Sequence, residues 1–265
     1  MTVLGVIGNI SIDTTRYPDG RTYTLVGGAA LHVALAAAAA GVTARPVAVI
    51  GDDLASLRAT PRPEGFDLSH VARVAGPSCR FDITYDADGQ VSGLTAAYGV
   101  ATALTSHALA VLSQSECDHW HVCCRRPLAV GQVLDRLVAM RRRFSLDFHL
   151  ASATEQIKAA ASALPYAEVV FVNAAEYRLL NGLELTHVVV SDGPRKVTLL
   201  RRGQVVGSET PAGGPVVEVT GAGDTLAGTF LAEILQGTSE PDALAAAVAA
   251  ATRQTRCPGL LYEPP

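Results

Sequence analysis

The sequence lacks a strong excess of either charge. Lys and Arg number 21 and Asp and Glu number 25 among 265 residues, for a net charge of -4, and charged residues make up only 17% of the chain. Two short basic runs, Arg125–Arg126 and residues 141–144, are more typical of solvated helix ends than of a nucleic-acid surface, which needs a broad basic face. The composition therefore argues against a nucleic-acid partner.

Long hydrophobic runs and cysteine motifs are also missing. No run reaches the roughly 18 apolar residues that span a bilayer, and the N-terminal residues form a strand-like run without the basic region of a signal peptide. The five cysteines include no CxxC and no Cys/His metal spacing, and Cys123 and Cys124 are adjacent, which suits neither bridging nor chelation. We interpret them as reduced core residues of a cytoplasmic protein that has no membrane partner.

Strand-like and helix-like runs alternate along most of the chain. A strand is expected at about residues 3–10 and a helix at about 29–40, and short apolar runs later alternate with helices at about 128–142 and 153–164. Apolar strands that end in polar or small residues are typical of parallel strands buried on both faces. The pattern predicts an α/β protein with a mainly parallel sheet.

Two segments, residues 14–28 and 79–93, break this alternation and predict antiparallel β-structure. In the second, Phe81, Ile83 and Tyr85 alternate with polar residues, which is the period of a half-buried strand. We expect the two segments to form a small β flap over the carboxyl ends of the parallel strands, where open α/β sheets bind ligands.

The stretch EVTGAGDTLAGTF, residues 218–230, predicts an anion-binding turn. Residues 216–219 have the character of a short strand, Thr220 is the expected N-cap, and apolar residues at helical spacing follow Asp224. The three small residues before Asp224 then lie at a helix N-terminus, where backbone N–H groups lack partners and favour anions. A P-loop and a GxGxxG motif, the two commonest phosphate cradles, are both absent from the sequence.

Asp224 admits two interpretations. Acidic residues are common in the first turn of a helix, where they contribute a few tenths of a kcal/mol. A carboxylate beside an anion site is also a workable arrangement for phosphoryl transfer, in which the carboxylate takes the proton of an attacking hydroxyl. The turn by itself does not separate capping from catalysis.

Four further stretches precede this turn in the chain: GNISID, GGAALHVALAAAAAG, VNAAE and VVVSDGPRKV. Together with VTGAGDTLAGTF, the most specific of the five, they resemble the PfkB (ribokinase-like) carbohydrate kinases in order and spacing. The resemblance covers most of the chain. It implies a single domain over residues 1–265, with a three-layer α/β/α body around a mainly parallel sheet and a β lid at about residues 14–26 and 78–98.

The resemblance also implies an ATP-dependent kinase that uses Mg²⁺ and acts on a sugar, a nucleoside or a sugar-like cyclitol. Lids of this kind often form homodimers. Asp224 would deprotonate the acceptor hydroxyl, beside an anion hole formed by Gly221, Ala222 and Gly223. The residues implied to bind the acceptor are Asp13, Gly27, Gly28 and His32. Those implied to bind ATP are Asn173, Glu176, Ser191, Gly193 and Arg195, with Glu176 acting on Mg²⁺ through water.

Purely structural roles are also open for several of these residues. Asn173 and Glu176 could mark a strand end followed by a helix start, Asp13 could be a turn residue, and the two glycines could form a tight turn. His32 could equally be a helix histidine packed on the sheet.

The sequence departs from the family pattern at four places. His32 stands where an asparagine is usual, His149 replaces the amide of a D-x-N stretch, Lys196 replaces a glycine of the phosphate loop, and the helix after residues 51–53 is abbreviated. These departures suggest a specialised member. They also keep open a second hypothesis, a lapsed kinase that binds a sugar or nucleotide, although a pure binder has no use for Asp224. A hydroxymethylpyrimidine-type kinase is a third option, and the β flap counts against it.

Overall fold

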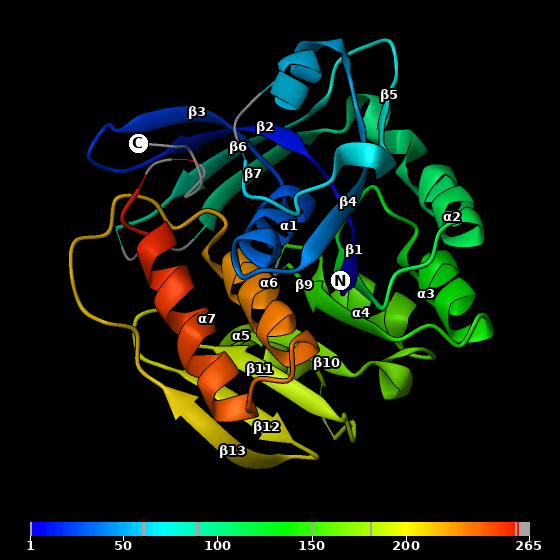
Figure 1. Cartoon of the computed structure of the whole chain (residues 1–265). Helices are drawn as coiled ribbons and strands as arrows, with labels where there is room; N and C mark the ends of the chain where they lie inside the picture. Colours follow the sequence, from blue (N-terminus) through cyan, green and yellow to red (C-terminus); the bar gives the residue numbers. More distant parts are fainter. Residues whose placement is uncertain are drawn as a thin grey trace.

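Nine strands form one large sheet through the middle of the molecule (Figure 1). The computed structural model describes residues 2–59, 62–87, 91–149, 151–180, 182–257 and 259. In spatial order the strands are β13 (Gln204–Glu209), β12 (Val197–Arg201), β11 (His187–Ser191), β10 (Val169–Asn173), β9 (Phe144–Phe148), β8 (His119–Cys124), β1 (Val3–Ile7), β4 (Thr43–Ile50) and β5 (Val71–Arg73).

In this spatial order, the seven strands from β11 across to β5 run parallel. β12 and β13 add antiparallel strands at the edge beside β11. Every residue of β8 and β9 is buried, as expected for central strands covered on both faces.

Helices cover both faces of this sheet, which gives the predicted three-layer α/β/α body. One apolar core lies between the sheet and α1 (Ala29–Ala39), α6 (Ala222–Leu235) and α7 (Glu240–Gln254). The other lies against α2 (Leu104–Gln114), α3 (Val130–Ala139) and α4 (Ala153–Ala160). The remaining helices are short: α5 (Ala174–Tyr177), η1 (Asp52–Ala59), η2 (Leu68–His70), η3 (Gly99–Ala103), η4 (Leu164–Tyr166) and η5 (Arg178–Leu180).

A second sheet of four strands lies beside the carboxyl end of β1 (Figure 1). Its order is β3 (Thr22–Gly27), β2 (Ser11–Arg16), β6 (Cys79–Tyr85) and β7 (Val91–Ala97). The two predicted antiparallel pairs are present, and a parallel pairing of β2 with β6 joins them. Among the helices within the described ranges, none is long and apolar enough to cross a membrane.

Several expected element boundaries are wrong, each for a local reason. The first strand stops at Ile7, and the chain bends before β2. Residues 216–219 form no strand, because the N–H groups of Val217 and Glu218 both donate to the carbonyl of Thr255 after α7. Helix α3 ends early, and Arg141 adopts a positive φ of 53° just beyond it.

The cysteines are free, as expected, but they are not all core residues. Cys79, Cys117, Cys123 and Cys124 are buried, whereas Cys257, after α7, is exposed. The interpretation of all five as core residues is therefore wrong for Cys257.

Close packing of α1 against α6 depends on Gly228. A Cβ at this position would lie 2.2 Å from the carbonyl oxygen of Val33 and 3.0 Å from Cβ of Ala36. Gly228→Ala gains about 1 kcal/mol in helix propensity, but the overlap costs about 1–3 kcal/mol. We expect a net loss of stability, measured as a lower urea midpoint of unfolding.

Gly213→Ala is the matched control, because a Cβ at Gly213 meets nothing within 4 Å. Its unfolding midpoint should not fall below the wild-type value, because an alanine that fits only restricts the unfolded chain. A Gly228→Ala protein as stable as wild type would show that the two helices can separate without cost.

Candidate active site

The GAGD turn lies where the chain enters α6, and its backbone requires glycine at Gly221. Gly221 is the N-cap of α6 and has a φ of 78°, in the left-handed region. A Cβ there would also lie 2.4 Å from Nδ1 of His32. The cap expected at Thr220 is therefore wrong, and the Thr220 hydroxyl instead shares a 2.9 Å hydrogen bond with the Tyr85 hydroxyl of β6. Ala222, Gly223 and Asp224 form the first turn of α6. The Ala222 N–H donates a 3.2 Å hydrogen bond to the carbonyl of Val219, whereas the N–H groups of Gly223 and Asp224 have no backbone acceptor among the described residues and can bind an anion.

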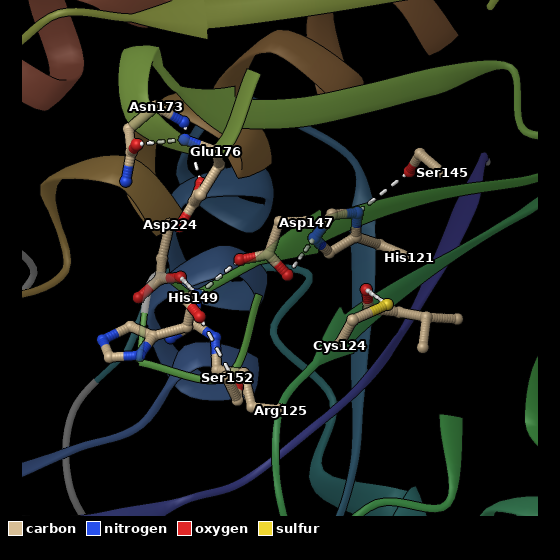
Figure 2. Close-up of polar contacts among 11 residues, drawn as sticks. His121, Cys124, Arg125, Ser145, Asp147, His149, Ser152, Asn173, Glu176 and Asp224 are labelled. Carbon is tan, nitrogen blue, oxygen red and sulfur yellow. Dashed lines mark hydrogen bonds and ion pairs between the residues drawn. The ribbon is translucent and has the colours of Figure 1, made fainter. Parts of the chain in front are cut away.

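Asp224 is buried in this first turn and is ion-paired with Arg125. The Nη2 atom of Arg125 lies 2.7 Å from Oδ1 of Asp224 and also contacts Oδ2 of Asp147 on β9 (Figure 2). Burial acts to raise the pKa of Asp224, but Arg125, together with smaller contributions from His32 and His149, outweighs it, so that the pKa lies below its ordinary value. For Asp147 burial prevails over the guanidinium and raises the pKa to about 6. Asp224 is thus the carboxylate of the two that stays ionised most readily.

Arg125 is a residue that sequence reasoning missed. It was expected at a solvated helix end, but it follows β8 directly and its side chain is only 23% exposed. Arg126 fits the expectation better, since its side chain is 59% exposed and pairs with Glu155. The available signal was an arginine directly after an apolar strand, since ligands of open α/β sheets bind beyond the carboxyl ends of strands.

Asp13, Gly27 and His32 lie together beside Asp224. A Cβ on Gly27 would lie 2.4 Å from Oδ2 of Asp13 and 3.6 Å from Nε2 of His32. Burial raises the pKa of Asp13 to about 6, although a 2.6 Å hydrogen bond from the Ser11 hydroxyl acts to lower it. The Asp224 carboxylate also acts to raise this pKa. Burial also lowers the pKa of His32, which keeps the imidazole neutral. Within the described ranges, the His32 side chain makes no hydrogen bond, and its Nδ1 side packs against Gly221.

Gly28 has a clear packing role. It is the N-cap of α1, with a φ of 97°, and a Cβ there would lie 2.4 Å from the carbonyl oxygen of Asn9. The same carbonyl accepts a 3.1 Å hydrogen bond from the N–H of Ala30. Gly28 thereby brings the start of α1 against the loop that leads into Asp13.

Asn173 and Glu176 form a capping box where β10 passes into α5. The Asn173 side chain accepts from the N–H groups of Ala175 and Glu176, and Oε2 of Glu176 accepts a 2.8 Å hydrogen bond from the Asn173 N–H. Their structural role as a strand end and helix start is therefore real. Burial raises the pKa of Glu176 to about 7, although the hydrogen bond from the Asn173 N–H acts to lower it. The nearby Asp147 carboxylate also acts to raise this pKa.

Ser191, Gly193 and Arg195 follow on the next strand and its turn. Ser191 pairs in register with Asn173, and Gly193 has a φ of 55° in the turn between β11 and β12. The Arg195 side chain is 73% exposed and pairs with Asp192. The structure brings Ser191 beside the capping box and leaves Arg195 at the surface.

Two more polar residues belong to this region. His149 lies beside Arg125 and Asp224 (Figure 2), and burial lowers its pKa to about 4. Glu218, which sequence reasoning missed, is buried and accepts hydrogen bonds from the Thr15 hydroxyl (3.3 Å) and the Gly259 N–H (3.1 Å). Its signal was a single acidic residue within an apolar run.

Known proteins resemble this chain in sequence and in architecture. A family model described as pfkB family carbohydrate kinase matches residues 1–264. A cytidine kinase of Thermococcus kodakarensis is 31% identical over 254 residues, which cover 89% of this chain and 90% of that protein.

Solved structures show the same fold. A nucleoside kinase of Burkholderia thailandensis, solved with inosine, has a TM-score of 0.79 at 19% identity and covers 99% of this chain and 94% of its own. A ribokinase of Cryptococcus neoformans var. grubii serotype A, solved with ADP, has a TM-score of 0.76 at 19% identity and covers 98% and 96%. Because the family model matches nearly the whole chain, the chain belongs to the pfkB family of carbohydrate kinases.

Proposed function

We propose that the protein transfers the γ-phosphoryl group of ATP to a hydroxyl of a nucleoside. The observation that carries this proposal is the position of Asp224, a buried carboxylate at the N-terminus of α6 that Arg125 keeps ionised. A carboxylate that only caps a helix gains from exposure to the helix dipole, and it needs neither burial nor a guanidinium partner. Both features are consistent with a carboxylate that accepts a proton.

In the proposed reaction the acceptor hydroxyl approaches Asp224 from the side of Asp13 and His32. Oδ2 of Asp13 and the imidazole of His32 orient the acceptor, and Asp224 takes the proton as the oxygen attacks the γ-phosphorus. The bond from the γ-phosphorus to the β–γ bridging oxygen breaks, and ADP leaves. The N–H groups of the Gly221–Gly223 turn offset the charge on the transferred group. Arg125 positions the base.

Glu176 fits a role beside Mg²⁺. In the part of the chain that the structure describes, its Oε1 atom makes no hydrogen bond, and the side chain lies near Asp147 and Arg125. One free carboxylate oxygen suits a hard cation that keeps most of its water and binds the phosphates of a nucleotide. The ion would neutralise charge on the ATP phosphates, with Ser191 and the Gly193 turn on the same side.

The choice of a nucleoside rests on relatives. The match to the cytidine kinase covers 89% of this chain and 90% of that protein. In addition, a neutral His32 offers a ligand one donor and one acceptor, unlike the amide usual at that position. A coupled assay of ATP consumption over nucleosides, sugars and aminocyclitols tests this choice. Turnover of a pyrimidine nucleoside supports it, whereas tight binding without turnover of any acceptor supports a lapsed kinase.

Asp224→Asn should lower kcat by about 10²–10⁴-fold, the usual contribution of a general base. ATP affinity should stay within about threefold, because the N–H groups of the turn remain. Steady-state kinetics with the best acceptor of the screen, together with ATP titration by calorimetry, measure both quantities.

Asp242→Asn is the matched control for helix capping. Asp242 also lies in the first turn of a long helix, α7, where the Ser239 cap bonds it. Its replacement should leave kcat unchanged. If Asp224→Asn behaves like Asp242→Asn, then Asp224 only caps its helix and the proposed mechanism is wrong.

The pKa of about 6 for Asp13 predicts how acceptor binding depends on pH. An ionised carboxylate accepts hydrogen bonds at both oxygens, whereas protonation turns one oxygen into a donor and removes the charge. The ionised form, which binds hydroxyls better, is lost as the pH falls through that pKa. The KM for the acceptor should therefore rise about tenfold between pH 7 and pH 5, measured at saturating ATP and Mg²⁺.

Asp13→Asn should abolish this pH dependence and raise KM at pH 7. A wild-type KM that is flat from pH 5 to pH 7 would contradict a role for Asp13 in acceptor binding. Glu176 also titrates near this pH range. Saturating ATP and Mg²⁺ ensures that weaker Mg²⁺ or ATP binding at low pH does not change the measured KM for the acceptor.

A further inference from the structure

His121, Cys123 and Asp147 meet on one face of the central sheet. His121 and Cys123 are two residues apart on β8, so their side chains point to the same side of the strand. Asp147 of β9 pairs in register with Cys123. All three residues are buried. One ligand atom from each, an imidazole nitrogen, the thiol sulfur and a carboxylate oxygen, lies within 4.8 Å of the other two.

Two of these atoms are buried without a hydrogen-bond partner of normal geometry. They are Nε2 of His121 and Oδ1 of Asp147, and they lie 3.7 Å apart. An unsatisfied buried polar group costs about 1–3 kcal/mol, and each such group calls for an explanation. Here the two atoms lie close to each other, and the Cys123 sulfur lies within 4.8 Å of a ligand atom of each residue.

The neighbours of this group hold it in an arrangement suited to a metal. The Ser145 hydroxyl lies 2.9 Å from Nδ1 of His121 (Figure 2), which leaves Nε2 as the nitrogen that faces the cluster. Arg125 contacts Oδ2 of Asp147, which leaves Oδ1 free. Such outer contacts orient the ligands at known metal sites.

We propose that His121, Cys123 and Asp147 bind a transition-metal ion of the Zn²⁺ type. Zn²⁺ takes imidazole, thiolate and carboxylate ligands in a tetrahedron, whereas Mg²⁺ takes oxygen ligands and keeps its water. Bond lengths of about 2.1 Å place two tetrahedral ligands about 3.4 Å apart, close to the 3.7 Å between Nε2 and Oδ1. Binding releases the Cys123 proton to solvent, and a water completes the fourth position.

This site goes beyond the proposed kinase activity, although it shares Asp147 with the bridge to Asp224. Asp147 would bind the ion through Oδ1 while Oδ2 keeps Arg125. Metal binding can be measured without turnover, so failure of the metal site and failure of the kinase assignment are separate results.

The experiment uses full-length protein that carries Cys257→Ser, because Cys257 is an exposed thiol that could bind metal by itself. Metal is removed with a chelator, and Zn²⁺ is then titrated in competition with a chromophoric zinc indicator. Co²⁺ replaces Zn²⁺ in a parallel titration followed by absorption. We expect one ion per chain and a thiolate-to-Co²⁺ charge-transfer band.

Cys123→Ser should remove that band and weaken Zn²⁺ binding by more than about 100-fold, because loss of an outer-shell partner alone costs 10- to 100-fold. Cys124→Ser is the matched control. Cys124 is equally buried, but it is the next residue of the strand, so its side chain lies on the opposite face, where it packs in the other core. Its replacement should leave both readouts unchanged.

Two results would overturn the proposal. The first is a protein carrying only Cys257→Ser that binds no Zn²⁺, or binds Co²⁺ without a thiolate band, and this result does not depend on the folding of the Cys123 variant. The second is equal affinity in the Cys123→Ser and Cys124→Ser proteins.

Discussion

The ion pairs of Arg125 with Asp147 and Asp224 hold together the end of β8, the end of β9 and the start of α6. Each carboxylate is buried and has lost much of its solvation, and the cation offsets the cost of that loss. Breaking a buried pair of this kind costs about 3–5 kcal/mol, because it leaves an uncompensated charge. The placement of the Asp224 carboxylate thus depends on a residue from the other half of the chain.

This arrangement also concentrates negative charge. Burial raises the pKa of Asp13, and the nearby carboxylates of Asp224 and Glu218 raise it further. The pKa of Asp224 is lowered instead, because Arg125 lies beside it. Groups with separated pKa values can take different roles at one pH. The Arg125 guanidinium lies 2.7 Å from Asp224 and favours its ionised form, whereas it is not among the groups that shift the pKa of Asp13.

The fold and the family could be predicted from local sequence. Apolar runs of strand length, alternating with helical runs, indicated the parallel sheet, and the β segments around residues 14–28 and 79–93 indicated the small second sheet. Motifs such as GAGD depend on residues adjacent in the chain, so they survive in the sequence. Boundaries failed where distant contacts prevailed, as at residues 216–219, where Thr255 takes the backbone hydrogen bonds of the expected strand.

The sequence alone determined the helix-start turn at Gly221, the carboxylate that follows it and the succession of strands that leads to it, because each is set by neighbours along the chain. Tertiary structure decided which side chains contact Asp224 and Asp147. Arg125 and Asp147 are far from Asp224 in sequence, and Asp147 joins His121 and Cys123 only because β8 and β9 pair in one register. Contacts across a sheet depend on strand order and register, which local patterns do not encode.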